Sequence, residues 1–465
     1  MKKIKTCHAF TPEGKALVFL MRIIATIIRF FYGKKFDTPL ENYLEDARYF
    51  KFPSRDLFYF LYKYYHRPPT VDDTDGATKA HFAKQNFDDL VPFGFEEKIS
   101  VTFTAAGDLM PYEWIKKEYC QELWDDIGED FFSSDIVFAN LETPINRSKP
   151  ASYVPEMMLN DMYFNGSSEM FDIFNGNKKY KGFDVLSTAN NHSLDMGEEG
   201  LLANIAFLNE KKIPYVGTAT SEKDRDNFPI LEKNGVKIAF LAYTYSMNKM
   251  LNPEGKTYLC NHIELNKPDV DLQLLKNQVL MAKMKGADLV VASVHYGNAY
   301  QAFPSKHIVK NTHRFFDECG VDIVLGGHAH NIQPMENYDF VCPISKERKK
   351  GFVIYALGDF IAYDIFTWGH LPVYLKMKIS KGIFQGKEKT ILTKVEAKPV
   401  YVCGVYHSKK KRELKLLDAK KLMQNIDNQV VVNDFNKAEF EYLMRFYNEN
   451  FAVNRKDFLI KNIYA

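Results

Sequence analysis

The chain predicts an α/β fold, in which helices cover a sheet of short strands. Short runs of β-branched and other apolar residues alternate with longer amphipathic stretches, such as residues 198–212 and 270–286, which is typical of strands followed by covering helices. The chain has 465 residues, of which 46% are hydrophobic and 26% charged. This composition is that of a folded globular protein, and the length suits two to four structural units at ~100–200 residues each.

Three regions of different sequence character divide the chain. Residues 1–98 are rich in aromatic residues and are predicted to be helical, with a basic amphipathic arm at their start. Residues 99–375 carry the alternating pattern of the predicted α/β domain. Residues 376–465 contain predicted strands, the last ending at residue 406, and then predicted helices over 411–464. We therefore expect a central α/β domain with helical additions at both ends.

Charge and cysteine content exclude several classes of protein. The 61 basic and 59 acidic residues leave a net charge of +2, so no overall field attracts nucleic acid. The basic run 409–412 has no interleaved aromatic residues and is expected to be a solvated turn. The six cysteines lie far apart without a C-x-x-C pair, which argues against a disulfide framework and a cysteine zinc site. We expect buried thiols and no nucleic-acid partner.

The first 35 residues form a basic arm, with eight Lys or Arg side chains and one acid. Its apolar stretch at 16–32 is interrupted by Arg22 and Arg29, so it lacks the ~18–20 apolar residues that span a bilayer, and it does not match a signal peptide. On a helix, these arginines and Lys15 form a narrow polar stripe beside a wide apolar face. Such a helix either makes peripheral contact with an anionic membrane or packs on the protein. The expected location is cytoplasmic or membrane-associated.

Polar residues follow the ends of six apolar runs in the central region. The runs are 101–106, 135–139, 183–189, 288–294, 321–327 and 352–357, and they are followed by GD, NLE, NNH, HYG, HAH and GDF. Ligands of α/β proteins bind at the carboxyl ends of the strands, so these side chains should gather in one place. Asp, Glu, Asn and His without thiolates suit one or two divalent ions such as Mn²⁺, Fe²⁺ or Zn²⁺.

Such a set of ligands predicts a specific chemistry. A carboxylate can bridge two ions, whereas imidazoles and an Asn carbonyl add neutral ligands. Two ions about 3.5–4 Å apart would activate water and bind a phosphoryl oxygen. His328 and His330 lie two residues apart in an extended turn, so they need not face the same ion. Gly326 and Gly327 are expected to let the backbone bend there.

The motifs of the central region also resemble a known family. The blocks AAGDLMP, ANLETPI, TANNHSLDMGEEGL, SVHYG, VLGGHAHNIQP and YALGDF occur in this order between residues 104 and 361. Together they resemble the CapA (poly-γ-glutamate capsule synthesis) family, a branch of the calcineurin-like metallophosphoesterase superfamily. The resemblance implies a four-layer α/β/β/α sandwich, a polymer or small-molecule substrate, and other capsule-synthesis proteins as partners.

The same resemblance implies roles for individual residues. The implied metal ligands are Asp108 and His330 for one ion, Glu142 as the bridging carboxylate, and Asn191, His295 and His328 for the second ion. His192 would be the general acid next to the leaving group, and Asp195 would orient it.

Three positions depart from the family pattern. Met110 stands where phosphoesterases carry the His of the first block, and a thioether is a poor ligand for a hard ion. The first metal site should therefore be weak, with a metal-to-protein ratio nearer one than two. Ala299 and Asp359 stand where family members often carry Glu and Asn.

These observations leave three functions open. The first is a metal-dependent enzyme that hydrolyses or transfers at a phosphoester, ester or amide bond of a polymer or its precursor. The second is a metal-independent, epimerase-like enzyme that acts on a peptide, with the side chains of Asp108, Glu142, His192 and His295 moving protons. The third is a non-catalytic polymer-assembly protein. Candidates for a basic rim around an anionic substrate are Lys116, Lys117, Arg147, Lys149 and Arg314.

Overall fold

The computed structural model describes most of the chain. The described residues are 7–32, 36, 58, 61–65, 76–157, 162–425 and 433–452. Much of the predicted N-terminal helical region, the first six residues of the basic arm and the last part of the predicted helical tail lie outside these ranges.

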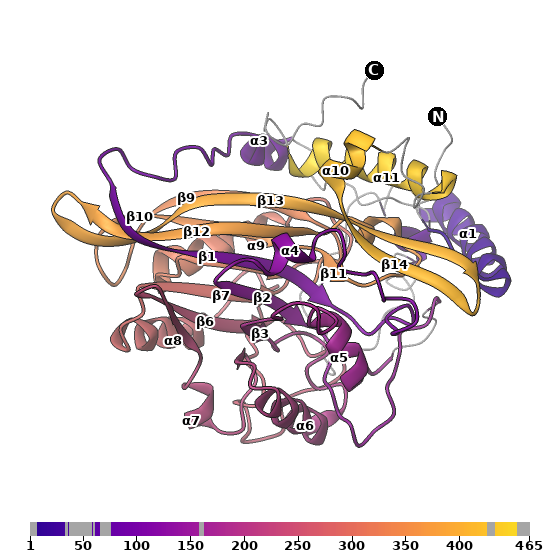
Figure 1. Cartoon of the computed structure of the whole chain (residues 1–465), viewed down its shortest axis with the longest axis horizontal. Coiled ribbons are helices and arrows are strands. Elements are labelled where there is room, and N and C mark those ends of the chain that lie inside the picture. Colours follow the sequence, from indigo (N-terminus) through magenta and orange to yellow (C-terminus); the bar gives the residue numbers. More distant parts are fainter. Residues whose placement is uncertain are drawn as a thin grey trace.

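Two sheets form the centre of the molecule (Figure 1). The first contains β1 (Glu96–Leu109), β2 (Ile136–Leu141), β3 (Val185–Ser187), β4 (Tyr215–Val216), β11 (Asp359–Ile361), β12 (Val373–Phe384), β13 (Lys387–Ser408) and β14 (Lys411–Asp418). The second contains β5 (Ile230–Lys233), β6 (Val236–Thr244), β7 (Leu289–His295), β8 (Ile323–Gly327), β9 (Gln333–Val341) and β10 (Arg348–Ala356). The order in the first sheet is β14-β13-β12-β1-β2-β3-β4, with β11 beside β1, and in the second it is β5-β6-β7-β8-β10-β9.

All six predicted apolar runs form strands, in β1, β2, β3, β7, β8 and β10, the last of which spans Arg348–Ala356. Strands β1 to β4 are parallel to one another, and so are β6, β7, β8 and β10. Every residue of β2, β7 and β8 is buried, as expected for parallel strands that are covered on both faces. The carboxyl ends of the two parallel sets carry the predicted polar residues.

The two sheets pack face to face. Phe240 of β6 lies between the sheets, with its ring centroid 5.7 Å from that of Phe103 in β1 and 6.1 Å from that of Phe138 in β2. Full burial of each such side chain contributes about 1.5–3 kcal/mol to stability. This apolar layer holds the two sheets together and fixes the distance between their carboxyl ends.

Helices cover the outer faces of both sheets (Figure 1). The helices concerned are α4 (Gly128–Phe132), α5 (Ser168–Phe174) and α6 (Gly197–Glu210) on the first sheet, and α8 (Gln273–Met284) and α9 (Lys306–Arg314) on the second. Phe171 of α5 meets Phe207 of α6 at a centroid distance of 5.0 Å, within the apolar cluster that includes Val137 and Leu186 of the first sheet. The fold is the predicted four-layer α/β/β/α sandwich.

The C-terminal part departs from the prediction in one segment. Residues 411–418, predicted to be helical, form strand β14, which pairs with β13. Buried and less buried side chains alternate along the first half of β14, a period of two that suits a strand. Helices α10 (Ala419–Asn425) and α11 (Asp434–Phe446) then follow as predicted.

Two further predictions concern the boundaries between the three regions and the state of the cysteines. The predicted boundaries at 98/99 and 375/376 fall inside β1 and β12, so both additions continue directly into the first sheet. The division into 1–98, 99–375 and 376–465 stays a prediction. All six cysteines are free and buried, as predicted.

Helix α1 (Pro12–Tyr32) presents two apolar faces. One face packs on the protein through Val18, Ala25 and Ile28, which are buried. The opposite face, called the outer face of α1 below, is exposed. Its large apolar residues are Phe19, Leu20, Ile23, Ile27, Phe30 and Phe31. Within the described ranges, none of the helices combines the length and the apolar character that crossing a bilayer requires.

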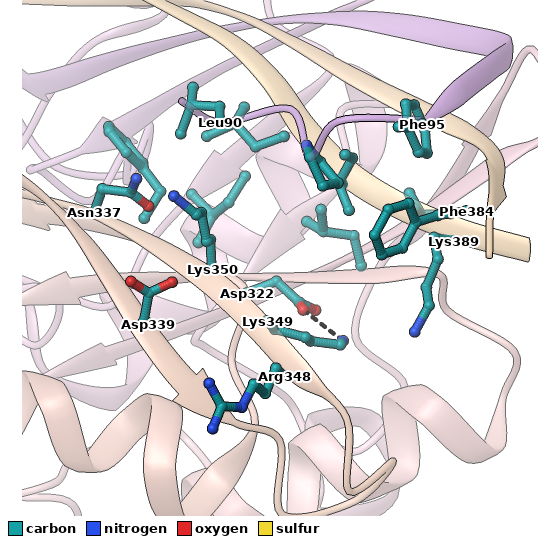
Figure 2. A pocket seen from close by; sticks show the side chains of 17 residues that line it. Leu90, Phe95, Asp322, Asn337, Asp339, Arg348, Lys349, Lys350, Phe384 and Lys389 are labelled. Atoms are coloured by element: carbon teal, nitrogen blue, oxygen red, sulfur yellow. Dashed lines mark hydrogen bonds and ion pairs between the residues drawn. The ribbon is translucent and has the colours of Figure 1, made fainter. Parts of the chain in front are cut away.

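A cavity of about 240 Å³ lies at the amino ends of β7, β8 and β10, away from the ends that carry the predicted site (Figure 2). Leu90, Phe95 and Phe384 are among its apolar lining residues. Below them, Lys349 Nζ is 2.9 Å from Asp322 Oδ1. The segment 90–95, which leads into β1, therefore forms one wall of the cavity.

Candidate metal centre

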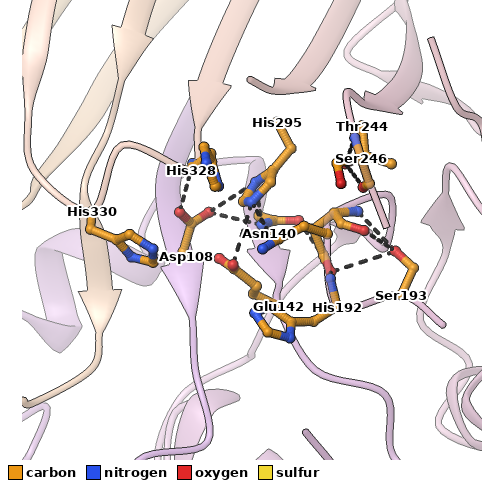
Figure 3. Close-up of polar contacts among 12 residues, drawn as sticks. Asp108, Asn140, Glu142, His192, Ser193, Thr244, Ser246, His295, His328 and His330 are labelled. Atoms are coloured by element: carbon orange, nitrogen blue, oxygen red, sulfur yellow. Dashed lines mark hydrogen bonds and ion pairs between the residues drawn. The ribbon is translucent and has the colours of Figure 1, made fainter. Parts of the chain in front are cut away.

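Polar side chains from both sheets meet at the carboxyl ends of the parallel strands (Figure 3). Asp108 lies near the end of β1, Glu142 directly follows β2, and His295 is the last residue of β7. All three are at most 2% exposed. One ligand atom of each residue lies within 4.8 Å of those of the other two. The predicted convergence of these side chains is confirmed.

His295 and Asp108 are held by neighbouring groups. His295 Nε2 is 2.9 Å from Asn191 Oδ1 and 3.3 Å from Glu142 Oε1. Asn140 Nδ2 donates to Asp108 Oδ1 at 2.8 Å, and the backbone N–H of His328 donates to Asp108 Oδ2 at 3.1 Å. Of the six predicted metal ligands, Asp108, Glu142 and His295 thus form a close group, Asn191 contacts His295, and the backbone of His328 contacts Asp108.

Several buried polar atoms of the centre have no hydrogen-bond partner. They are both carboxylate oxygens of Glu142 and Nδ1 of His328. Leaving such a group unpaired costs about 1–3 kcal/mol. A void of about 10 Å³ adjoins Asp108, Asn140 and His295, which is roughly the volume of one water-sized sphere. Two carboxylates and a neutral imidazole around unpaired oxygens fit a divalent cation.

Burial sets the charge state of these groups. It raises the pKa of Asp108 to about 7, with a further contribution from the nearby Glu142 charge, and it raises the pKa of Glu142 to about 7. Burial lowers the pKa of His295 to about 4 and that of His328 well below its usual value. The imidazoles are therefore neutral at pH 7 and able to act as ligands. A bound cation would favour the ionised form of both carboxyls.

His192 and Asp195 form the predicted pair. His192 Nδ1 is 2.6 Å from Asp195 Oδ2, which also accepts a hydrogen bond from the Phe164 backbone N–H at 2.6 Å. The imidazole stacks on the Phe164 ring with centroids 3.6 Å apart. Burial lowers the pKa of His192, but the Asp195 carboxylate outweighs it, so the net shift is upward. The ring is fixed in orientation and carries a proton at neutral pH more readily than a free histidine.

The turn after β8 differs from its predicted form. The left-handed backbone conformations are at His328 and His330, with φ of 81° and 57°, and not at the preceding glycines. Those glycines instead permit close approach. A Cβ on Gly327 would lie 2.9 Å from Asp108 Oδ1, and one on Gly326 would lie 2.0 Å from the Tyr355 carbonyl oxygen. Backbone strain of this kind is concentrated at functional sites.

The surroundings of His330 differ from those of the other predicted ligands. Its Nδ1 is 3.0 Å from Asp359 Oδ1, and its ring stacks on Tyr300. Burial lowers the pKa of His330, but Asp359 outweighs it and the pKa rises to about 10. Met110 is 2% exposed and lies within an apolar cluster. Among the described residues at this centre, the close group of three ligands does not include His330.

Some residues of the centre were not predicted from the sequence. Tyr245 OH lies 2.9 Å from His328 Nε2, and Phe164 supports His192. Tyr245 directly follows β6, whose apolar run at 236–243 was not among the six and could have revealed it. Asn140 belongs to one of the quoted blocks, but its contact with Asp108 was not predicted. Of the predicted rim, Arg147 and Arg314 are paired with Glu210 and Glu318.

Comparison with known proteins identifies the family. The family model described as "Bacterial capsule synthesis protein PGA_cap" matches residues 102–364, which is more than half of the chain and includes every predicted site residue. The chain belongs to the PGA_cap family. This confirms the resemblance to CapA proteins.

Individual PGA_cap relatives are distant. The "Capsule biosynthesis protein CapA" of Bacillus anthracis is 27% identical over 288 residues, covering 60% of this chain and 63% of the relative. The "PGA biosynthesis protein CapA" of Bacillus subtilis (strain 168) is 27% identical over 275 residues, covering 57% and 64%. The matched region thus spans just under two thirds of each relative.

A solved structure also shows a distant likeness. It is the calcineurin-like phosphoesterase YfkN from Bacillus subtilis, with a TM-score of 0.34 and 12% identity, covering 74% of this chain and 99% of that chain.

Proposed function

We propose that this chain is a metal-dependent hydrolase or transferase that acts on a phosphoester, ester or amide bond of a polymer, or of its precursor, in capsule or poly-γ-glutamate-type biosynthesis. The observation that carries the proposal is the buried group of Asp108, Glu142 and His295, in which neither Glu142 oxygen has a hydrogen-bond partner. Membership of the PGA_cap family supports the biosynthetic setting. Other capsule-synthesis proteins are the proposed partners.

Asp108, Glu142 and His295 would hold the ion, with Asn191 and His328 beside them. Bound in such a group, a divalent ion polarises a carbonyl or phosphoryl oxygen and makes water a better nucleophile. Asn140 and the His328 backbone N–H keep the Asp108 carboxylate in place. Those hydrogen bonds fix the ligand geometry before the substrate arrives.

His192 would donate a proton to the leaving group. Its Nδ1 is engaged by Asp195, so Nε2 is the nitrogen available to a substrate. A histidine whose pKa is raised holds its proton at neutral pH and can release it to a developing anion. Asp195 acts through this imidazole and is a positioning residue.

The two other functions considered from the sequence fit the geometry less well. An epimerase with two bases needs an acid and a base on opposite faces of a carbon atom, whereas Asp108 and Glu142 lie in one compact group. In a non-catalytic assembly protein, the cost of burying both the Asp108 and Glu142 carboxyls would serve no reaction. A bound cation would account both for the close grouping of Asp108 and Glu142 and for the Glu142 oxygens that have no hydrogen-bond partner.

A substrate screen tests the proposed reaction. The Mn²⁺-loaded chain would be assayed with phosphomonoester, phosphodiester, carboxylic ester and γ-glutamyl amide substrates, with Glu142→Gln as the matched control. Turnover of one class that Glu142→Gln and EDTA both abolish supports the proposal. Absence of turnover in every class, or turnover that survives both treatments, contradicts it.

The affinity for metal should depend on pH. Asp108 and Glu142 have pKa values of about 7 without an ion, so each must lose a proton on binding below that pH. The apparent affinity should therefore fall by up to about 100-fold per pH unit between pH 6 and pH 5, since each proton contributes about 10-fold. Above pH 8 it should become constant. Calorimetric titration with Mn²⁺ measures this, and an affinity independent of pH from 5 to 8 would contradict it.

We also propose that the outer face of α1 contacts an anionic membrane. Phe19, Phe30 and Phe31 are 68%, 85% and 71% exposed. Lys15 and Arg29 flank this face, and the hairpin between β13 and β14 adds the exposed basic run 409–411. The hairpin lies beside α1, because Lys409 Nζ is 3.1 Å from Glu13 Oε1. Apolar side chains beside basic ones suit the interface of an anionic bilayer.

Replacing the three outer-face phenylalanines with serine should weaken binding to phosphatidylserine vesicles by at least about 10-fold, because their apolar area no longer leaves water. Sedimentation with vesicles measures this. Phe93→Ser is the matched control, since Phe93 is exposed and lies outside α1. Equal vesicle binding by the triple variant and the unmodified chain would exclude this contact.

A further inference from the structure

A second cluster of metal-ligating side chains lies outside the centre described above. His81 in α3 (Ala77–Ala83), His313 in α9 and Glu336 in β9 come together from three distant segments. Nε2 of each histidine is hydrogen-bonded to the same atom, Glu336 Oε1, at 2.9 Å. The ligand atoms of all three residues lie within 4.8 Å of one another. The proposed function uses none of them.

Neighbouring groups fix two of these side chains in place. The Glu336 side chain is 1% exposed, and its Oε2 accepts a hydrogen bond from Tyr355 OH at 2.6 Å. This leaves Oε1 as the oxygen that faces both imidazoles. The His313 ring stacks on Tyr338 with centroids 4.0 Å apart. Supporting contacts of this kind orient metal ligands in known sites.

The spacing is close to that of a zinc site. With bonds of about 2.0–2.1 Å from zinc to nitrogen and oxygen, two ligands of a tetrahedron lie about 3.3 Å apart. On binding an ion, the two hydrogen bonds of 2.9 Å would open by a few tenths of an ångström, and the two histidine nitrogens, which lie within 4.8 Å of each other, would take positions about 3.3 Å apart. Two histidines and one glutamate form an established zinc ligand set that leaves a fourth position for water. The side chains of His81 and His313 are 40% and 22% exposed, so solvent reaches that position.

We propose that His81, His313 and Glu336 form a second divalent metal site, suited to Zn²⁺, that fastens α3 to the second sheet. Beyond α3, the chain is held to that sheet by a hydrogen bond from the Asn337 backbone N–H to Gln85 Oε1 at 3.0 Å. A bound ion would link three segments and strengthen this attachment. It would also steady the segment 90–95, which forms a wall of the cavity at the amino ends of β7, β8 and β10 (Figure 2). This site is independent of the proposed reaction.

Cobalt titration of the full chain tests the second site, because tetrahedral Co²⁺ has a characteristic visible absorption. The starting protein is Glu142→Gln, in which the first centre is disabled. It should still bind one equivalent of Co²⁺ with that absorption. Loss of a residue that only supports a metal ligand typically lowers metal affinity by roughly 10- to 100-fold. Adding His313→Gln or His81→Gln, each of which removes a ligand, should weaken Co²⁺ binding by more than this. His407→Gln, which alters an exposed histidine 3.3 Å from Glu413, is the control and should leave it unchanged.

His81→Cys distinguishes coordination from a structural role. A cysteine thiolate is itself a metal ligand, so this variant should bind Co²⁺ and gain a sulfur-to-cobalt charge-transfer band. Absence of Co²⁺ binding by Glu142→Gln would overturn the second site, and so would binding that is insensitive to both glutamine substitutions. Neither result bears on the first centre. That centre is tested separately, by measuring how much bound metal the Glu142→Gln substitution removes.

Discussion

Replacing Glu142 with glutamine should remove about one equivalent of bound metal and slow turnover by at least about 1,000-fold, which corresponds to roughly 4 kcal/mol of barrier. The substitution keeps the size of the side chain but removes a charge from the centre, and it turns an amide N–H toward the ion. Asp108 and His295 would remain as ligands, together with the adjacent Asn191. Mass spectrometry of bound metal after dialysis, combined with the substrate assays, measures both effects.

The fold should survive this substitution. Both Glu142 oxygens lack hydrogen-bond partners, so the metal-free variant should melt no lower than the metal-free parent. Glu439→Gln is a matched control at another buried acid, whose carboxylate accepts hydrogen bonds from Tyr401 and Thr367. It should lower the melting temperature and keep the metal. Retention of the full metal content by Glu142→Gln would show that this carboxylate is not a ligand.

Replacing His192 with alanine should slow turnover by about 10²- to 10⁴-fold, the range for loss of a general acid. The metal content should not change, because Nδ1 of His192 is engaged by Asp195 and the residue lies outside the close group of ligands. Turnover and bound metal are measured on the same preparation. Loss of metal together with activity would instead make His192 a ligand.

Asp195→Asn separates orientation of His192 from its chemistry. The Asp195 carboxylate raises the pKa of His192, so its removal should lower that pKa. His192 would then lose its proton at a lower pH, so the alkaline limb of the pH–rate profile should shift to lower pH. An unchanged profile in this variant would contradict the role of His192 as the acid.

Much of the fold could be predicted because buried parallel strands have a strong local pattern. The runs that became β2, β7 and β8 are apolar throughout, as strands covered on both faces must be. Strand β14 differs from its predicted helix because it pairs with β13 across the hairpin at 408–411, and the hydrogen bonds of that pairing decide its conformation. The preference of a short segment for a strand depends on its pairing and burial more than on its own composition.

The central residues of the candidate site could be predicted because they lie at the ends of these buried strands. Asp108, Glu142 and His295 each follow or end a strand, so the rule for the carboxyl ends of parallel strands brought them together. The contact between Tyr245 and His328 and the bend at His328 depend on how the second sheet packs, which no motif encodes. His81, His313 and Glu336 lie on three separate segments without a common pattern, and only the folded chain shows them side by side.

The central claim is that one ion lies among Asp108, Glu142 and His295, and anomalous diffraction from crystals of the Mn²⁺-loaded chain tests it most directly. We expect a strong anomalous peak within bonding distance of a Glu142 oxygen and of His295 Nε2, slightly beyond the ~2.0–2.2 Å of the corresponding bonds to the smaller Zn²⁺ ion. Absence of a peak at this position in crystals grown with excess Mn²⁺ at pH 8, with Glu142 contacted by water alone, would contradict the claim.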